Sequence, residues 1–260
     1  MTGVSTACLY PMNTEQALKT LAELSIDTVE IFFNSFSEIE PAFVKNLKRI
    51  ADHAGMKIAA IHPFTSSFES FMLFTPYGRR FEDMLELYKK YFQAAKILGA
   101  NVLILHGDND GGPLSDAEYF ERFAALADAG RDYGVTTAQE NVFKFRGAHP
   151  HFISKMRQHL GSNAKFVFDI KQALRSGYDP FDVLDAMGED VVHIHLSDNL
   201  PQGTNGIDNT CLMPFKGNFN FERLADKLRS ASFDGCYILE VYRRCFEHPE
   251  EINIVKNLAF

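Results

Sequence analysis

Eight short apolar runs that recur along the chain constrain its fold more than any other feature. Each run is rich in β-branched or aromatic residues, and segments with helical periodicity separate the runs. Their starts lie 24, 29, 44, 34, 30, 26 and 45 residues apart. The average unit of about 32 residues is the length of one strand and its crossover helix. The expected strands cover residues 4–10, 28–33, 57–62, 101–106, 135–140, 165–169, 191–196 and 236–241.

Eight consecutive strand–helix units predict an α/β protein, a single (β/α)8 or TIM barrel with its active site at the carboxyl ends of the strands. No Pro-, Ser- or Gly-rich linker divides the chain, so residues 1–260 are expected to form one domain. The alternative is a doubly wound open sheet. Such a sheet normally carries a glycine-rich phosphate turn after its first strand, and here that segment reads LYPMNT. The expected helices cover residues 14–24, 40–54, 80–98, 116–133, 151–160, 179–187, 221–230 and 249–258.

Two connections are longer than the others and follow strands, which in a barrel places them on the catalytic face. Residues 63–78, PFTSSFESFMLFTPYG, are unusually aromatic for a loop and precede Arg79 and Arg80. This segment is either a structural flap or a lid whose rings and arginines contact a sugar or its phosphate. Residues 197–220 are rich in glycine, asparagine and proline, which predicts an irregular loop.

Composition narrows the functional class. The formal net charge is −8, whereas nucleic-acid binding depends on basic surfaces that neutralise phosphates. Small-molecule chemistry is therefore expected, without a nucleic-acid partner. No apolar run is long enough to span a bilayer, the amino terminus lacks the pattern of a signal peptide, and the four cysteines lack metal-binding or redox spacing. These features predict a cytoplasmic protein with reduced thiols and no membrane partner.

Carboxylate and imidazole side chains occupy the expected carboxyl ends of most strands. They are Glu30, His62, His106, Glu140, Asp169, His193, His195 and Glu240. Side chains at these ends converge on the mouth of a barrel. Because ionisable groups are costly to bury unless they are paired or bound to a metal, this ring predicts a metal site.

Four of these residues form the predicted metal set: Glu140, Asp169, His195 and Glu240. They lie 29, 26 and 45 residues apart, one strand–helix unit each, so they belong to four neighbouring strands. Three carboxylates and one imidazole suit Mn²⁺, Mg²⁺ or Co²⁺, and Zn²⁺ is also compatible. One acidic residue alone would indicate a helix cap or a salt bridge, but four at corresponding positions favour a metal.

Several motifs resemble the xylose isomerase-like TIM barrels of the sugar phosphate isomerase/epimerase family. The motifs, in chain order, are IHPF, LILHGD, AQENVF, FVFDIKQALRSGYDP, VVHIHLSDN, CLMPFKGNFNF and YILEVYR. The resemblance covers most of the chain. It implies a TIM barrel whose metal ligands are Glu140, Asp169, His195 and Glu240, with Glu140 and Glu240 also serving as the acid/base pair.

The resemblance also implies a reaction: isomerisation or epimerisation of a ketose, aldose or sugar phosphate by proton transfer through a metal-stabilised enediolate. One divalent metal per chain is expected, with Mn²⁺ preferred over Mg²⁺, Co²⁺ or Zn²⁺. Many relatives carry Asp-x-x-His at the sixth strand, where this chain has Asp169-Ile-Lys-Gln172. Glutamine is a poor metal ligand, which favours a single metal. Cys211 also stands where many relatives have histidine, and a neutral loop cysteine is expected there.

A second group of residues is predicted to bind the substrate: His62, His106, Lys171, Gln172 and Arg243. For the two histidines the alternatives are a metal-binding or a purely structural role. Lys171 and Arg243 suit a phosphate or carboxylate, with a surface salt bridge as the alternative. Glu30 is expected to orient a substrate hydroxyl or to anchor a loop, and His193 to be a packed core histidine.

Three other functions stay open at this point. A metal-dependent lyase or dehydratase acting on a keto-inositol would use the same enolate chemistry. An abasic-site DNA endonuclease of the same superfamily needs further histidines, where this chain has Gln172 and Cys211. A non-catalytic sugar-binding protein would keep the barrel without turnover. The resemblance also allows a homo-oligomer, since relatives often form dimers or tetramers.

Overall fold

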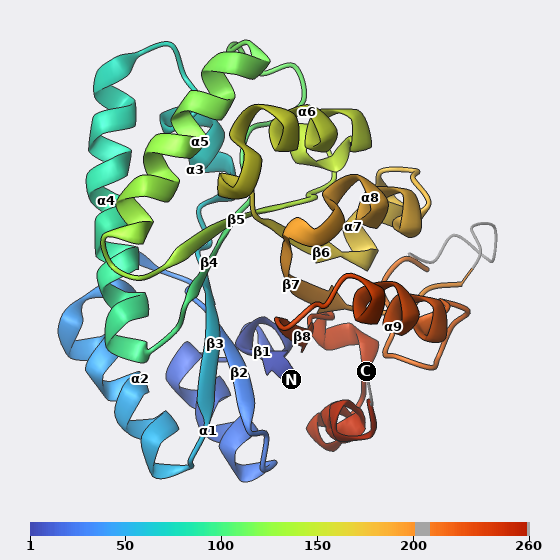
Figure 1. Cartoon of the computed structure of the whole chain (residues 1–260). Helices are drawn as coiled ribbons and strands as arrows, with labels where there is room; N and C mark the ends of the chain where they lie inside the picture. The colour runs from blue at the N-terminus through green and yellow to red at the C-terminus, as the bar shows by residue number, and fades with distance from the viewer. Residues whose placement is uncertain (201–208, 259–260) are drawn as a thin grey trace.

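Eight parallel strands close into a barrel in chain order, from β1 to β8 and back to β1 (Figure 1). The computed structural model describes residues 1–200 and 209–258. The strands are β1 (Thr2–Ser5), β2 (Thr28–Phe32), β3 (Lys57–His62), β4 (Val102–Leu105), β5 (Thr136–Glu140), β6 (Phe166–Asp169), β7 (Val191–Leu196) and β8 (Cys236–Leu239). The predicted (β/α)8 architecture is confirmed.

Helices surround the barrel and connect successive strands (Figure 1). They are α1 (Thr14–Glu23), α2 (Pro41–His53), α3 (Ser66–Met72), α4 (Gly78–Leu98), α5 (Asp116–Arg131), α6 (Pro150–Leu160), α7 (Ile170–Arg175), α8 (Pro180–Met187) and α9 (Phe221–Ser230). The main apolar core lies between this ring of helices and the strands. It includes Leu18 and Leu21 of α1, Phe92 of α4 and Phe123 of α5, all fully buried. None of the helices in the described part of the chain is both long and apolar enough to cross a lipid bilayer.

Side-chain alternation along the strands places the site residues above a small apolar layer. Ala60, Ile104, Ala138 and Val167 form one buried cluster with Val102. Because side chains two residues apart on a strand share a face, these residues lie directly below His62, His106, Glu140 and Asp169. The strand register places the carboxyl ends of neighbouring strands at the same height in the barrel. Asp169 on β6, for example, pairs with His195 on β7.

Several expected elements differ from the structure. The first strand ends at Ser5 rather than at residue 10, because a 3-10 turn (Thr6–Leu9) begins there and Ser5 accepts a hydrogen bond from the Ala7 amide. The expected loop at 63–78 contains helix α3. The last expected helix is a 3-10 helix (Pro249–Asn257). Within the loop predicted at 197–220, residues 201–208 lie outside the described residues.

Candidate active site

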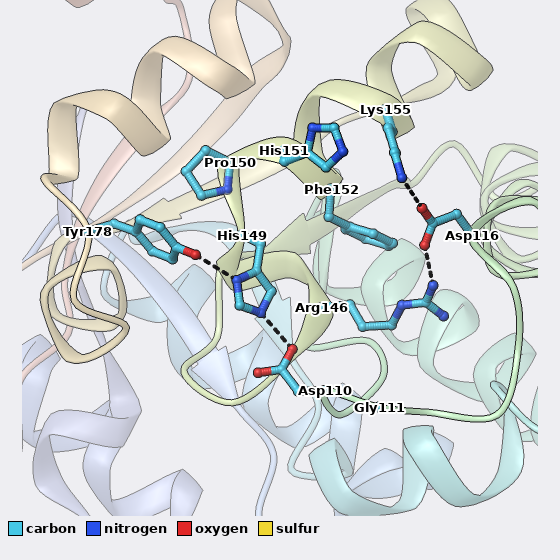
Figure 2. Close-up of a pocket in the computed structure, with 10 residues that line it drawn as sticks. All are labelled: Asp110, Gly111, Asp116, Arg146, His149, Pro150, His151, Phe152, Lys155 and Tyr178. Carbon is cyan, nitrogen blue, oxygen red and sulfur yellow. Dashed lines mark hydrogen bonds and ion pairs between the residues drawn. The ribbon is translucent and has the colours of Figure 1, made fainter.

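Two of the hollows that open among the loops after the strands hold clusters of ionisable side chains. The outer one, of about 630 Å³, lies over the segments after β4, β5 and β6 (Figure 2). Its ionic side chains pair with one another: His149 Nε2 lies 2.8 Å from Asp110 Oδ1, and Asp116 pairs with both Arg146 and Lys155. Its described lining holds none of the residues predicted from sequence, so we assign the chemistry to the inner hollow.

The inner cavity, of about 460 Å³, has both polar and apolar residues in its lining. Its lining includes the predicted residues His62, His106, Glu140, Lys171, Gln172 and Glu240. The other lining residues are Ala7, Tyr10, Phe32, Asn34, Phe64, Val241 and Tyr242. Phe64 belongs to the aromatic segment for which the sequence predicts a flap or a lid. A lining of apolar and aromatic side chains with several polar groups is usual for a small-molecule site.

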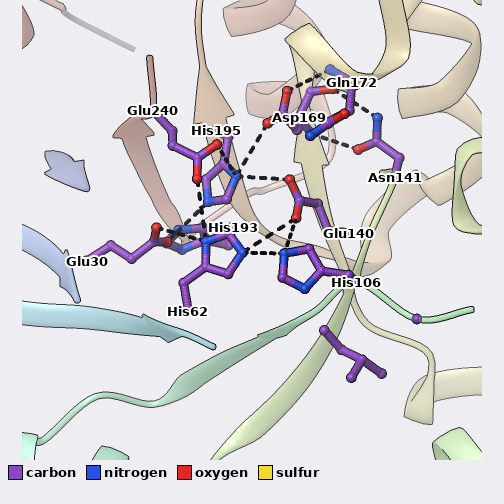
Figure 3. Close-up of polar contacts among 12 residues, drawn as sticks. Glu30, His62, His106, Glu140, Asn141, Asp169, Gln172, His193, His195 and Glu240 are labelled. Atoms are coloured by element: carbon purple, nitrogen blue, oxygen red, sulfur yellow. Dashed lines mark hydrogen bonds and ion pairs between the residues drawn. The ribbon is translucent and has the colours of Figure 1, made fainter. Parts of the chain in front are cut away.

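The four predicted metal ligands come together at the ends of their strands (Figure 3), and two of them, Glu140 and Glu240, line the cavity. One ligand atom from each of Glu140, Asp169, His195 and Glu240 lies within 4.8 Å of the others, and all four residues are buried. His195 Nδ1 lies 3.3 Å from Glu140 Oε1, 3.5 Å from Glu240 Oε2 and 3.6 Å from Asp169 Oδ2. Three carboxylates therefore surround a single imidazole nitrogen.

These distances fit a divalent cation. Ligand atoms at about 2.1 Å from a common ion lie about 3 to 3.5 Å from one another in octahedral or tetrahedral geometry. Among the described residues, Asp169 Oδ2, which faces His195 Nδ1, is buried and accepts no hydrogen bond, with Lys171 Nζ 3.2 Å away. Buried carboxylate oxygens without donors are costly unless a cation neutralises them. The residues present thus fit the metal that the sequence predicts.

The two carboxylate oxygens of Asp169 have different partners. Oδ1 accepts a hydrogen bond of 2.9 Å from the Gln172 amide and so caps helix α7, whereas Oδ2 points to the metal set. Its backbone is held by Asn141, whose side chain bonds both the amide and the carbonyl of Asp169. Asn141 was missed in the sequence, where its only signal is its position after Glu140. Asp169 can thus serve as a helix cap and as a metal ligand at the same time.

Glu30 orients the metal-facing imidazole. Its Oε2 lies 3.1 Å from His195 Nε2 and 2.8 Å from His193 Nε2. A proton on His195 Nε2 satisfies this contact and leaves Nδ1 for the metal, which is the usual arrangement of a metal-binding histidine. Burial would raise the pKa of Glu30, but the His195 charge and the hydrogen bonds outweigh it and hold that pKa well below its usual range. Glu30 therefore positions His195 as a carboxylate.

Lys171 pairs with two of the predicted ligands. Its Nζ lies 2.7 Å from Glu240 Oε2 and 3.2 Å from Asp169 Oδ2, and the side chain is buried. Burial would raise the pKa of Glu240, but the Lys171 ammonium and the His195 charge lower it well below its usual range. For Asp169 burial prevails, and the pKa is raised. Lys171 is thus a buried cation in the lining of the inner cavity and not a surface salt bridge.

Two further histidines line the cavity next to the metal set. His62 Nε2 lies 2.9 Å from His106 Nε2. His106 donates from Nδ1 to Glu69 Oε1 at 3.2 Å, which leaves its Nε2 as the acceptor for His62. Burial would lower the pKa of His62, but its contacts with Glu240 and Glu30 raise it to about 10. His62, His106 and Glu140 also offer ligand atoms within 4.8 Å of one another, which makes them a second candidate set for a cation.

Glu69 is a site residue that the sequence analysis missed. It lies on α3, is fully buried and accepts hydrogen bonds from the Gly107 amide and the Tyr88 hydroxyl, both at 2.7 Å. Its only signal in the sequence is an acidic residue within the aromatic segment 63–78. Glu69 fixes the orientation of His106 and ties α3 to the end of β4.

The remaining two predicted residues differ in placement. Gln172 lines the cavity, and its side-chain oxygen accepts a hydrogen bond of 3.1 Å from the Phe143 amide. Arg243 is outside the cavity lining. Its guanidinium donates to the backbone carbonyls of Phe246 and Glu247. A substrate contact of Arg243 stays a prediction.

Fold and site together define a class: a (β/α)8 barrel with a buried centre of carboxylates and imidazoles at its carboxyl-terminal mouth. A family model described as Xylose isomerase-like TIM barrel matches residues 18–260. The chain belongs to this family.

Sequence and structure comparisons support this assignment. An uncharacterized protein of Methanocaldococcus jannaschii is 24% identical over 253 residues, which cover 92% of this chain and 82% of that protein. Among solved structures, a D-tagatose 3-epimerase-like protein superposes with a TM-score of 0.78 at 20% identity, covering 98% of this chain and 94% of that chain. A D-psicose 3-epimerase superposes with a TM-score of 0.74 at 13% identity, covering 98% and 96%. These structural neighbours share the fold and include sugar epimerases.

Proposed function

We propose that this protein is a divalent-metal-dependent isomerase or epimerase of a ketose, an aldose or a sugar phosphate. The metal would be held by Glu140, Asp169, His195 and Glu240, with Mn²⁺ preferred over Mg²⁺, Co²⁺ or Zn²⁺ because the set is rich in oxygen. When bound, it would supply Lewis-acid stabilisation of the negative charge that develops on the substrate oxygens as a C–H proton leaves. The epimerases among the structural neighbours support this choice.

The proposal rests on one observation: in each of the two glutamates, one carboxylate oxygen belongs to the metal set and the other faces His62. Glu140 Oε1 and Glu240 Oε2 lie 3.3 and 3.5 Å from His195 Nδ1, within the metal set. Their other oxygens face His62, with Glu240 Oε1 3.4 Å from its Nδ1 and Glu140 Oε2 3.7 Å from its Nε2. Both carboxylates line the cavity. Each can thus hold the metal with one oxygen and exchange a proton through the other.

This arrangement serves proton transfer next to a carbonyl group. One glutamate removes the proton from the carbon beside the carbonyl, and the other can return a proton from the opposite side. Return to the same carbon gives an epimer, and return to the neighbouring carbon gives an isomer. His62, held as a cation between the two carboxylates, keeps them ionised until the substrate arrives. His106, Lys171 and Gln172 would contact the hydroxyl groups of the substrate.

Deuterium exchange tests the reaction whichever sugar is the product. Protein stripped with chelator and reloaded with Mn²⁺ is incubated in D₂O with a panel of ketoses and ketose phosphates, and deuterium at the carbons beside the carbonyl is measured by NMR. We expect exchange with the Mn²⁺-loaded protein and none with the stripped protein. Glu140→Gln and Glu240→Gln should each slow exchange by about 10²- to 10⁴-fold. Glu121→Gln, an exposed residue on α5, serves as the control.

Metal analysis of the same samples decides between related functions. One tightly held ion per chain, accompanied by exchange, supports the proposal. Two or three tightly held zinc ions without exchange on any sugar would contradict it and favour hydrolytic chemistry, with His62, His106 and Glu140 as the further ligands. Absence of metal binding under all loading conditions would contradict the site assignment itself.

A further inference from the structure

We propose that Cys211 and Cys245 form a reactive thiol pair that a hydroperoxide oxidises to a disulfide and a dithiol reduces again. Cys211 lies in the segment between β7 and α9, and Cys245 ends a 3-10 turn (Arg243–Cys245) after β8. Their sulfur atoms are 3.6 Å apart although the residues are separated by 34 positions in the chain. A disulfide requires about 2.05 Å, so a local movement of about 1.5 Å joins them. This inference does not depend on the proposed sugar chemistry.

The surroundings give the two thiols different exposure. Cys245 is half-buried and lines an open hollow of about 570 Å³ whose wall carries Lys216, Arg244 and His248 together with the carboxylates of Glu247 and Glu251. Cys211 is only 3% exposed and lies behind it. A partly exposed thiol next to a second thiol, with cationic side chains nearby, is an arrangement found in redox-sensitive proteins. An oxidant would therefore reach Cys245 first.

The more exposed thiol, that of Cys245, is also the more acidic of the two. A hydrogen bond from the Cys211 thiol lowers the pKa of Cys245 to about 7, against the effect of burial. The same contact, together with burial, raises the pKa of Cys211. Because the thiolate is the nucleophile, Cys245 is the attacking sulfur and Cys211 the resolving one.

The chemistry balances with a hydroperoxide as the only oxidant. The Cys245 thiolate attacks the terminal oxygen of the hydroperoxide, the O–O bond breaks, and the leaving alkoxide takes up a proton to become an alcohol. The sulfenic acid formed on Cys245 is then attacked by the Cys211 sulfur. That step forms the S–S bond and releases hydroxide, which takes the Cys211 proton and leaves as water. Two thiols lose two electrons in total, and one hydroperoxide is reduced.

The pair borders the inner cavity. The Cys245 amide donates a hydrogen bond of 2.8 Å to the carbonyl of Tyr242, which lines that cavity. Leu212, next to Cys211, forms two backbone hydrogen bonds with Asp198 just beyond β7. A disulfide would therefore tie the segment after β7 to the segment after β8, on the side of the cavity where Tyr242 lies.

Peptide mapping after peroxide treatment tests the pair directly. The full-length protein is treated with hydrogen peroxide at neutral pH, its remaining thiols are blocked with N-ethylmaleimide, and it is digested without reductant for mass spectrometry. We expect a cross-linked peptide that contains Cys211 and Cys245, lighter by two hydrogen atoms than the sum of the reduced peptides. Dithiothreitol should remove the cross-link.

Serine variants assign the two roles. Cys211→Ser should leave a sulfenic acid on Cys245 that dimedone traps, whereas Cys245→Ser should leave Cys211 unmodified. Cys236→Ser, which replaces a buried cysteine on β8, should behave as the unmodified sequence does. Oxidation of Cys245 to sulfinic acid without a cross-link in the unmodified sequence would overturn the proposal. A disulfide that involves Cys8 or Cys236, or one that forms only between chains, would also overturn it.

Discussion

Glu30 Oε2 lies 3.1 Å from His195 Nε2, and the opposite nitrogen of that ring faces three carboxylates. The two residues belong to β2 and β7, which are separated in the barrel by β1 and β8. The contact fixes both the orientation and the tautomer of the imidazole. In the proposed metal site, Glu30 would therefore hold His195 in its metal-binding form.

Replacing Glu30 should weaken metal binding without removing a ligand. Glu30→Gln keeps the size of the side chain but loses the charge that favours a proton on His195 Nε2. Loss of such a contact typically costs about 10- to 100-fold in metal affinity, and we expect this range for Mn²⁺ measured by calorimetric titration. Glu23→Gln, an exposed residue on α1, should leave the affinity unchanged. An unchanged affinity in Glu30→Gln, with the fold intact by circular dichroism, would contradict the assigned role.

Metal uptake should release protons at neutral pH. Burial would lower the pKa of His195, but the charges of Glu240 and Glu30 raise it well above its usual value. In the metal-free protein the ring is therefore protonated at neutral pH, and a metal must displace the Nδ1 proton to bind. Apparent Mn²⁺ affinity should rise with pH, by up to about tenfold per unit below the raised pKa, because one proton competes with the metal.

Calorimetric titration in two buffers of different ionisation enthalpy measures this proton release. The binding enthalpy observed should differ between the buffers by the number of protons released per metal multiplied by the difference between the two ionisation enthalpies. Equal enthalpies in the two buffers, together with an affinity that does not change between about pH 6 and about pH 8, would show that His195 is already neutral in the metal-free protein.

The sequence predicts the barrel and the ends of its strands well, because both follow from periodicity. The expected strands at 57–62 and 191–196 match β3 and β7. Alternation along each strand also predicts that the four metal-set side chains converge. The expected first strand extends too far along the chain because Thr6 to Leu9 are as apolar and β-branched as a strand. There the Ser5 and Thr6 hydroxyls instead bond backbone amides of Ala7 and Phe32.

Residues that act from loops and short helices could not be placed from periodicity. Glu69 reaches His106 only because α3 folds back over the end of β4, a contact that joins residues 37 positions apart. Lys171 lies next to Glu240 because Asp169 starts helix α7 immediately after β6. Arg243 lies next to a cavity-lining residue, Tyr242, but nearby backbone carbonyls bind its guanidinium. Such placements depend on tertiary contacts that local sequence does not specify.

Removing the Lys171 charge should destabilise the metal-free protein more than the metal-bound one. Lys171→Met leaves the Glu240 and Asp169 carboxylates buried without their nearest cation. Breaking a buried ion pair typically costs about 3 to 5 kcal/mol, and we expect a loss near the lower figure in the free energy of unfolding, measured with urea. Bound Mn²⁺ would neutralise the same oxygens and reduce the loss.

The control for this variant is Lys45→Met, an exposed residue on α2, which should change stability by less than about 0.5 kcal/mol. Equal destabilisation of Lys171→Met with and without Mn²⁺ would contradict the idea that lysine and metal share carboxylate oxygens. Metal binding should also be retained in this variant, since Lys171 itself supplies no ligand.

Replacing Glu69 should disturb His106 through the hydrogen bonds that Glu69 accepts. In Glu69→Gln, one acceptor oxygen becomes an NH₂ group. This group then faces either the Gly107 amide, or the Tyr88 hydroxyl and His106 Nδ1. A buried donor left against another donor costs about 1 to 3 kcal/mol, so we expect a loss of this size in urea unfolding. Deuterium exchange on the substrate should slow as well, because His106 loses its fixed orientation.

The control for this variant is Glu82→Gln, an exposed residue on α4, which should change neither the stability nor the exchange rate. If Glu69→Gln lost stability but kept the full exchange rate, Glu69 would serve the packing of α3 alone and not the candidate site.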